Sequence, residues 1–399
     1  MSRVAAVEVI PLKIPSQERD RPNLPPSLPG SDYHRQPHRG LVYSRHRETV
    51  FVKLTTDDGQ VGWGETLASV APEVAVQIVR TLLAPQLIGQ DPLAVDAIST
   101  ALFRSMRDRG HFTGFFADAV AGCDTALWDL RGRLLGLPVY TLLGGPYSTR
   151  LRAYASGLFN ARAGMGATAS PASTPAERAE AAKRMVEAGF DAIKLHLTRG
   201  RHDLVENVEA VRAAVGPKVD LMVDAHNTFD VAEAIKVGRE LERLDVLFFE
   251  APIDSENVAG LAELAATLQV RIATGEMERS RFQYRDRLVA RAVDVVQPDM
   301  GYVGLSEMRR IAGLADAFHV PVAPHLSAGL GPCIAATAHL MASIPNFMIL
   351  EYQPVSFELA NRLLKRPLRC EAGHLLLPEG PGLGVEPDEA ALREYEVKS

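Results

Sequence analysis

The chain has few cysteines, no long apolar run and no surplus of basic residues. Only three cysteines occur among 399 residues, and their scattered positions fit neither a disulfide framework nor a zinc motif. We therefore expect reduced thiols and a cytoplasmic protein. No run of about 18 uncharged apolar residues occurs, so no membrane contact through a spanning segment is expected. The net charge of −6 argues against a nucleic-acid partner, which would favour a basic surplus.

The length and the order of sequence patterns predict two units. A chain of 399 residues can hold one barrel of about 250 residues and a second, smaller unit. Residues 1–65 have the alternation of strands, with two of them joined at Asp58-Gly59. Residues 72–136 have helical spacing in three windows, and the last window ends on Gly136, a common helix stop. The windows are APEVAVQIVRTLLAPQLIG, DPLAVDAISTALFRSM and FFADAVAGCDTALWDLRGRLLG. An amino-terminal unit of strands followed by helices is therefore expected.

From residue 151 onward, short apolar runs alternate with helical windows, which predicts a parallel sheet. Eight runs occur, and eight is the number that closes a barrel. After the last run there is no room for a full helix, so we expect the tail to form strands and turns that pack back on the amino-terminal unit. The runs are LRAYASG (151–157), AIKLHL (192–197), DLMVDAH (220–226), VLFFEA (246–251), RIATGE (271–276), DVVQPD (294–299), VPVAPH (320–325) and FMILEYQ (347–353).

Three carboxylates end successive apolar runs at a constant interval. Asp224 and Glu250 are 26 residues apart, and so are Glu250 and Glu276. This interval suits one strand–helix unit, so the three acids should meet at the carboxyl-terminal mouth of the barrel. Hard oxygen donors suit Mg²⁺, whereas zinc is disfavoured because no cysteine is near and the histidines are not at ligand spacing. Helix N-capping is the alternative, but it does not explain the regular interval.

Two strands should each end with a pair of polar side chains on one face. Because side chains alternate along a strand, Lys194 and His196 point the same way, as do Asp224 and His226. A single such residue is more often a surface or core group than a functional one. Four of them on consecutive strands, beside the acids, indicate a functional site instead.

The same interval of 26 residues separates Asp299 from His325 and His325 from Glu351. These residues end the last three runs, so Asp299 and His325 should be neighbours. A carboxylate beside an imidazole fixes its tautomer and raises its basicity, which makes His325 a candidate general base. Glu351 could hydrogen-bond a substrate carboxylate or an enediolate oxygen. By contrast, His319 precedes its strand and His339 lies in a helical window, so both are expected to be structural.

Several motifs together resemble those of the enolase superfamily, in its mandelate racemase subgroup, over nearly the whole chain. The resemblance implies an α+β capping domain over residues 1–140, a (β/α)₇β barrel over 141–356, and a segment at 357–399 that packs back on the cap. It also implies Mg²⁺ on the three acids and a His325–Asp299 dyad that removes the proton α to a carboxylate. The motifs are GWGE at 62–65, ALWDLRGRLLGLPVYTLLGG at 126–145, the three acids, QPD at 297–299, APH at 323–325 and LEY at 350–352.

Two details of the resemblance bear on the reaction. Mandelate racemase has a Lys-x-Lys pair where this chain has Lys194-Leu195-His196, which disfavours a symmetric two-base racemase. The Asp224-Ala225-His226 segment is similar to the Asp-x-His of galactonate and mannonate dehydratases, in which the histidine protonates the departing hydroxyl. The favoured hypothesis is therefore an acid-sugar dehydratase that forms a 2-keto-3-deoxy acid.

Two other hypotheses remain open. The first is a racemase, epimerase or cycloisomerase that acts on a carboxylate through the same enediolate. The second is a non-catalytic barrel kept for binding. The substrate is expected to be a small carboxylate, with specificity set by the loops around 20–40, 62–68 and 159–175. The last of these is either a lid or a plain disordered loop. The family resemblance also implies a homo-oligomer.

Overall fold

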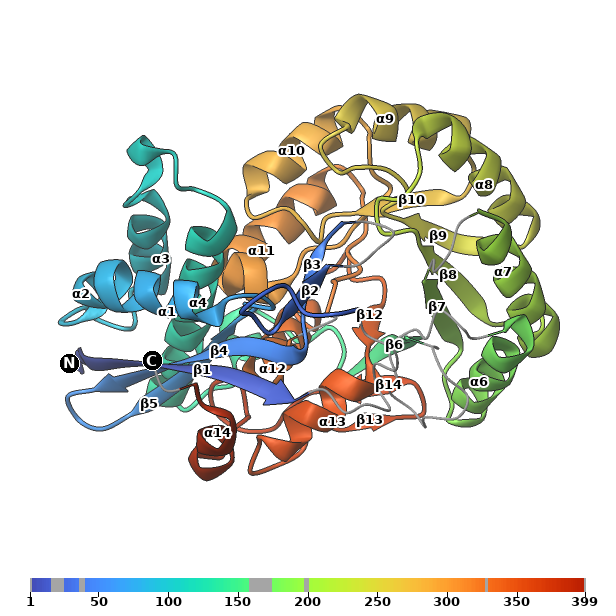
Figure 1. The fold of residues 1–399 in the computed structure, drawn as a ribbon. Helices are drawn as coiled ribbons and strands as arrows, with labels where there is room; N and C mark the ends of the chain where they lie inside the picture. Colours follow the sequence, from blue (N-terminus) through green and yellow to red (C-terminus); the bar gives the residue numbers. More distant parts are fainter. Residues whose placement is uncertain are drawn as a thin grey trace.

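The computed structural model describes residues 2–15, 25–35, 40–157, 174–196, 201–326 and 329–397. Two units lie side by side in Figure 1, a sheet with helices coloured mostly blue and a barrel coloured green to orange. The amino-terminal unit holds an antiparallel sheet of β1 (Val4–Pro15), β4 (His46–Thr56) and β5 (Val61–Thr66). A separate hairpin pairs β2 (Tyr33–Arg35) with β3 (Val42–Ser44). The predicted turn at Asp58-Gly59 joins β4 to β5.

The helices of this unit follow the predicted windows, with one interruption. The first window divides into α1 (Pro72–Ile78), a π-helical turn at Val79–Leu83, and α2 (Ala84–Leu87). Pro85 has no amide hydrogen to donate to the preceding turn, and the irregular turn lies directly before it. The other two windows form α3 (Val95–Arg104) and α4 (Gly114–Leu135). Helix α4 ends as predicted at Gly136, which has a left-handed φ of 67°.

The two glycines of the GWGE motif allow β5 to lie directly on α4. A Cβ atom on Gly62 would stand 2.5 Å from the carbonyl oxygen of Ala126, and one on Gly64 would stand 2.1 Å from that of Gly122. Neither separation is possible for a real side chain, so the backbone contact requires glycine at both positions. The motif therefore has a packing role, and Glu65 at its end projects from a rigid strand.

The second unit is a closed parallel barrel, which confirms the predicted fold class. The seventh run, around Val322, forms isolated parallel bridges to Val296 and Phe347 rather than a regular strand. Pro321 and Pro324 explain this irregularity because they cannot donate ladder hydrogen bonds. Closure comes from β12, which pairs with the first barrel strand. The strands are β6 (Arg150–Ser156), β7 (Ala192–His196), β8 (Asp220–Asp224), β9 (Val246–Glu250), β10 (Arg271–Thr274), β11 (Val295–Val296) and β12 (Leu350–Tyr352).

The barrel interior is filled by one buried side chain from each of the eight runs, with large and small residues interleaved. Helices cover the outside (Figure 1). The interior residues are Tyr154, Ala192, Met222, Phe248, Ala273, Val295, Ala323 and Ile349. After α5 (Val139–Leu142), which precedes the barrel, the helices are α6 (Pro175–Glu187), α7 (Arg201–Val215), α8 (Val231–Arg243), α9 (Val258–Thr267), α10 (Arg281–Val289), α11 (Met300–Ala317) and α12 (Gly331–Met341).

The tail differs in part from its prediction. The expectation of no further helix was wrong, because α13 (Pro354–Arg362) follows β12 directly and begins with Pro354, whose fixed φ suits a first helical turn. Strands β13 (Cys370–Glu371) and β14 (His374–Leu376) then form a hairpin, and β14 pairs with β6. Helix α14 (Glu389–Tyr395) reaches the amino-terminal sheet, where Glu389 forms an ion pair with Lys53 at 2.9 Å. The domain boundaries at 140 and 356 stay predictions.

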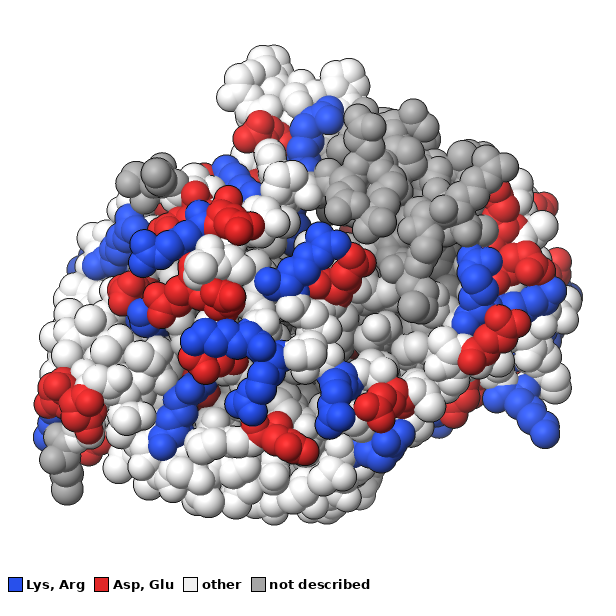
Figure 2. Space-filling model, turned by 90° about the horizontal axis from the view of Figure 1, so that it is seen from below, with Lys and Arg blue, Asp and Glu red and all other residues white. Residues whose placement is uncertain are grey.

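Surface properties follow the composition. Acidic and basic side chains are interspersed over the face drawn in Figure 2. Within the described ranges, no helix is both long and apolar enough to cross a bilayer. Cys123, Cys333 and Cys370 are free thiols, as expected.

Candidate active site

The strand register brings the predicted polar residues to one end of the barrel. His196 is the direct partner of Asp224 across β7 and β8, and Asp224 is the direct partner of Glu250 across β8 and β9. Glu276 follows β10 in the next position around the ring. The three carboxylates are 2%, 1% and 9% exposed. The structure thus collects the three acids in a buried cluster at the carboxyl ends of their strands.

Lys194 is the buried cation at the centre of this cluster. Its Nζ atom lies 2.9 Å from Glu250 Oε2 and 3.2 Å from Glu351 Oε1. Burial lowers the pKa of Lys194, but the charges of Glu250 and Glu351 raise it more, so the pKa stands well above its usual value. Lys194 is therefore a permanent positive charge at this end of the barrel.

The acids have unequal proton affinities. Burial raises the pKa of Asp224 and of Glu250 to about 7, with Lys194 lowering both and neighbouring carboxylates raising them again. Burial also raises the pKa of Glu276, but the charge and hydrogen bond of His325 outweigh it and bring the value to about 2. The carboxylates thus oppose one another's ionisation, and Lys194 offsets this repulsion only in part at Asp224 and Glu250.

His325 lies between two carboxylates. Its Nδ1 atom is 2.7 Å from Asp299 Oδ2, and its Nε2 atom is 3.0 Å from Glu276 Oε2. Burial lowers the pKa of His325, but Glu276 and Asp299 raise it well above the usual value. Asp299 is held in turn by the amide of Gly301, which donates to Oδ1 at 2.8 Å. The predicted neighbours Asp299 and His325 are thus in direct contact.

His226 and His196 lie on the other side of Asp224. The Nδ1 atom of His226 is 3.1 Å from Asp224 Oδ2, and the His226 amide donates to Oδ1 at 2.8 Å. This double contact holds His226 at a φ of 49°, a conformation that few non-glycine residues adopt. The ring of His196 packs edge-on against that of His226 at 5.1 Å. Burial and the charge of His226 lower the pKa of His196 well below its usual value, so His196 is neutral.

The expectation that no histidines are at ligand spacing was wrong. Donor atoms of His196, Asp224 and His226 lie within 4.8 Å of one another. Spacing along the chain missed this group because the residues come from neighbouring strands. The donor atoms already have partners within the chain, since His226 Nδ1 contacts Asp224 and His196 Nε2 lies 3.3 Å from Ser156 Oγ. We therefore interpret the group as a hydrogen-bonded network.

Two residues of the site escaped the sequence reasoning. Gln297 donates from Nε2 to Glu250 Oε2 at 2.7 Å, and its buried Oε1 has no hydrogen-bond partner among the described residues. Ser156, at the end of β6, contacts His196. Applying the same alternation to the first and sixth runs would have found both, because Gln297 shares a strand face with Asp299 and Ser156 shares one with Tyr154.

Other predicted positions lie elsewhere. His339 accepts a hydrogen bond from the amide of Tyr140 on Nδ1 and contacts the carbonyl oxygen of Leu383 through Nε2 at 3.0 Å, which is a structural arrangement as expected. His319 is exposed at the end of a helix, away from the acids. The loop around 159–175 falls almost entirely outside the described residues, as does part of the loop around 20–40.

A closed parallel barrel with buried acids, a lysine and an imidazole–carboxylate pair at its strand ends defines a barrel enzyme. Residues 177–391 match the family described as enolase C-terminal domain-like, and residues 31–144 match the mandelate racemase / muconate lactonizing enzyme N-terminal domain. The chain therefore belongs to the enolase superfamily, in the group of mandelate racemase and muconate lactonizing enzyme. Enzymes of this superfamily generally use Mg²⁺.

Known relatives share most of their length with this chain. It is 35% identical to D-galactarolactone cycloisomerase of Agrobacterium fabrum over 88% of this chain and 92% of that protein. It is 32% identical to arabinonate dehydratase of Saccharolobus solfataricus over 88% and 91%. A crystal structure titled as a putative isomerase from Sinorhizobium meliloti superimposes with a TM-score of 0.91 at 36% identity, covering 99% of this chain and all of that one.

Proposed function

We propose that the protein is a Mg²⁺-dependent acid-sugar dehydratase, which removes the proton α to a carboxylate and eliminates the β-hydroxyl as water. One observation carries this proposal. Two members of the acid cluster each contact a histidine. His325 touches Glu276, and His226 touches Asp224. Dehydration needs one base and one acid, and this arrangement supplies both beside the same cluster. The product would be a 2-keto-3-deoxy acid.

The metal would be held by Asp224, Glu250 and Glu276. Three buried carboxylates whose like charges repel one another, and a buried Gln297 oxygen without a hydrogen-bond partner among the described residues, fit a hard cation that prefers oxygen donors. When bound, Mg²⁺ supplies positive charge beside the substrate carboxylate.

Each remaining residue has a defined task in this mechanism. His325 takes the α-proton on Nε2, the atom that contacts Glu276 in this structure, and Asp299 orients the imidazole through Nδ1. Lys194 stays protonated near neutral pH because its pKa is raised well above the usual value, and its positive charge stabilises the negative intermediate. His226 protonates the departing hydroxyl. Glu351 contacts Lys194 and so can orient that cation toward the substrate.

A cycloisomerase is the second candidate function. Its support is the D-galactarolactone cycloisomerase of Agrobacterium fabrum, which has the higher identity of the two named relatives above. Proton abstraction by His325 is common to both reactions, and they differ in the fate of the intermediate. A ring-opening reaction of a lactone expels an internal oxygen as a carboxylate, which needs no acid, whereas dehydration expels a hydroxyl that His226 protonates.

A substrate screen separates these functions. With Mg²⁺ and a panel of C4 to C6 mono- and diacid sugars, we expect at least one to give a keto acid that semicarbazide traps. D-galactarolactone is included as the cycloisomerase probe, and recovered substrates are examined in D₂O for inverted, labelled material. A racemase would produce such material without a keto acid. If no acid sugar gives a keto acid, the dehydratase proposal is wrong.

Metal binding is a second expected result, measured by titration calorimetry with Mg²⁺. The Asp224→Asn variant should bind Mg²⁺ more than about 10²-fold more weakly. Mutation of a residue that only hydrogen-bonds to a metal ligand already lowers metal affinity about 10- to 100-fold. Asp245→Asn is the control, since Asp245 is exposed and has a φ of 52° that asparagine tolerates. Absence of Mg²⁺ binding in the unaltered protein would favour a non-catalytic barrel. The homo-oligomer and the cytoplasmic location stay predictions.

A further inference from the structure

The end of β5 in the amino-terminal unit contacts the segment that follows His325, although GWGE has no task in the proposed chemistry. Glu65 is fully buried. Its Oε1 accepts a hydrogen bond from the amide of Leu330 at 2.8 Å, and its Oε2 accepts one from the amide of Cys333 at 3.1 Å. Thr49, on the neighbouring strand β4, donates to Oε1 at 2.9 Å and so orients the carboxylate. Glu65 thereby holds the first turn of α12.

The same strand end also contacts the other half of the dyad. The amide of Leu67, two residues after Glu65, donates to the carbonyl oxygen of Gly301 at 3.0 Å. The amide of Gly301 in turn donates to Asp299 Oδ1. A Cβ atom on Gly301 would lie 2.6 Å from the Cβ atom of Leu67, so the two backbones meet as closely as glycine allows.

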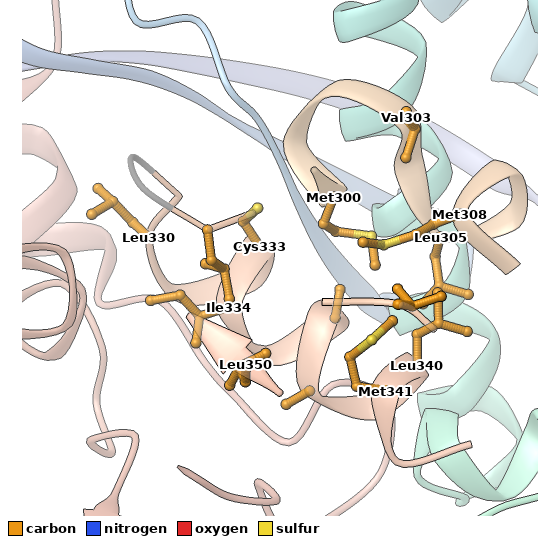
Figure 3. Close-up of a cluster of buried hydrophobic side chains, with 14 of the residues drawn as sticks. Met300, Val303, Leu305, Met308, Leu330, Cys333, Ile334, Leu340, Met341 and Leu350 are labelled. Carbon is orange, nitrogen blue, oxygen red and sulfur yellow. The ribbon is translucent and has the colours of Figure 1, made fainter. Parts of the chain in front are cut away.

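The two contacts converge on one pair of side chains. Asp299 and His325 are bridged through their backbones as well as by the 2.7 Å hydrogen bond. Behind them, α11 and α12 pack through a common apolar cluster that includes Met300, Leu330 and Cys333, as Figure 3 shows. A shift of either helix start would therefore move one member of the dyad relative to the other.

We propose that Glu65 and the backbone of Leu67 are positioning groups, through which the amino-terminal unit holds the His325–Asp299 dyad in its reactive geometry. This inference rests on the proposed function of the dyad as the base. A carboxylate is suited to the task because each of its two oxygens accepts one amide hydrogen bond, and these bonds are charge-assisted when it is ionised. Glutamine has only one oxygen, so it would leave one of the two amides facing an NH₂ group.

The test compares Glu65→Gln with Asp129→Asn. Asp129 is the matched control because it is also a fully buried carboxylate of this unit that accepts two amide hydrogen bonds, from Trp63 at 2.8 Å and Leu383 at 2.7 Å. It contacts β5 at Trp63, two residues before Glu65, but neither Gly301 nor the first turn of α12. We expect Glu65→Gln to lower the rate of deuterium incorporation into D-galactonate by about 10²-fold, the cost of a displacement near 1 Å. KM should change by no more than about twofold.

Two readouts need no substrate. Amide hydrogen exchange of Leu330 and Cys333 should be at least about tenfold faster in Glu65→Gln and unchanged in Asp129→Asn. Reaction of His325 with diethyl pyrocarbonate, followed on its own peptide, should shift its pH profile only in the Glu65 variant. If D-galactonate is inert with the unaltered protein, it is not a substrate, and these two readouts still decide whether Glu65 positions the dyad.

Unchanged exchange at Leu330 and Cys333 in a folded Glu65→Gln protein would overturn the proposal. Equal effects of both substitutions on exchange and activity would also overturn it, since they would show general destabilisation. If Glu65→Gln does not fold, Thr49→Val replaces it, because it removes one hydrogen bond to Glu65 and keeps the carboxylate. Amide exchange of Leu330 and Cys333 must then be faster than in the unaltered protein, by a smaller factor than expected for Glu65→Gln.

Discussion

His325→Asn is expected to abolish the exchange of the substrate's α-proton with solvent. Asparagine approximates the size of the imidazole and can still donate to Asp299, but it cannot accept a proton at any working pH. Loss of a general base costs about 10²- to 10⁴-fold in rate. The measurement is deuterium incorporation at the α-carbon in D₂O, read by NMR on an acid sugar that the unaltered enzyme turns over. Dehydration should fall by the same factor, because proton removal precedes it.

The control for this prediction is His319→Asn. His319 is exposed, lies six residues earlier in the chain and has a φ of 59°, which asparagine tolerates. The His319→Asn variant should exchange the substrate's α-proton at the rate of the unaltered enzyme. Circular dichroism must show both variants folded, since removing His325 leaves Asp299 and Glu276 buried without their shared partner. Exchange within about tenfold of normal in a folded His325→Asn protein would exclude His325 as the base.

His226→Asn is expected to stop dehydration while α-proton exchange continues. The substitution removes the proposed acid, so the intermediate still forms but takes back a solvent-derived proton at the α-carbon from His325 instead of losing the hydroxyl. Keto-acid formation should fall by about 10²- to 10⁴-fold, as for other losses of a general acid. Asparagine suits the left-handed φ of His226, so the backbone should be retained. The keto acid is measured with semicarbazide, and exchange by NMR on the same sample.

The ratio of the two rates is the diagnostic quantity. A high ratio of exchange to elimination supports His226 as the acid. An equal fall in both rates would instead indicate that His226 acts on proton removal, for example through its contact with Asp224. The His319→Asn variant should keep the normal ratio. An unchanged rate of keto-acid formation would exclude His226 and direct attention to its neutral neighbour His196.

The barrel was predictable because its signals are local and repeated. Apolar runs of strand length alternate with helical windows, and each run supplies one residue to the interior, from Tyr154 to Ile349. The helix α13 was missed because the segment after the eighth run was expected to be too short for a helix, whereas a helix of nine residues begins there directly at Pro354. The seventh strand was counted correctly but is irregular, since its prolines remove ladder hydrogen bonds. Neither error changes the architecture.

For the candidate site, the sequence predicted where the acids lie but not which residues they contact. The interval of 26 residues placed Asp224, Glu250 and Glu276 at one barrel end, because a regular strand–helix unit converts sequence distance into neighbouring positions. It could not show which partner each acid takes. That Glu276 contacts His325 and that Glu250 contacts Lys194 depends on side-chain packing across the mouth.

By itself, the sequence determined the kind of fold, the end of the barrel that carries chemistry and the residue types gathered there. These follow from periodicity, which short-range backbone geometry imposes. Only the tertiary structure decided that His226 and His196 join Asp224 in one network, and that Glu65 from the other unit reaches the segment beside His325. The contacts of His196 with Asp224 and of Glu65 with Leu330 join residues 28 and 265 positions apart, and no local pattern records them. The physical reason is that packing of one unit on another, rather than strand alternation, sets those distances.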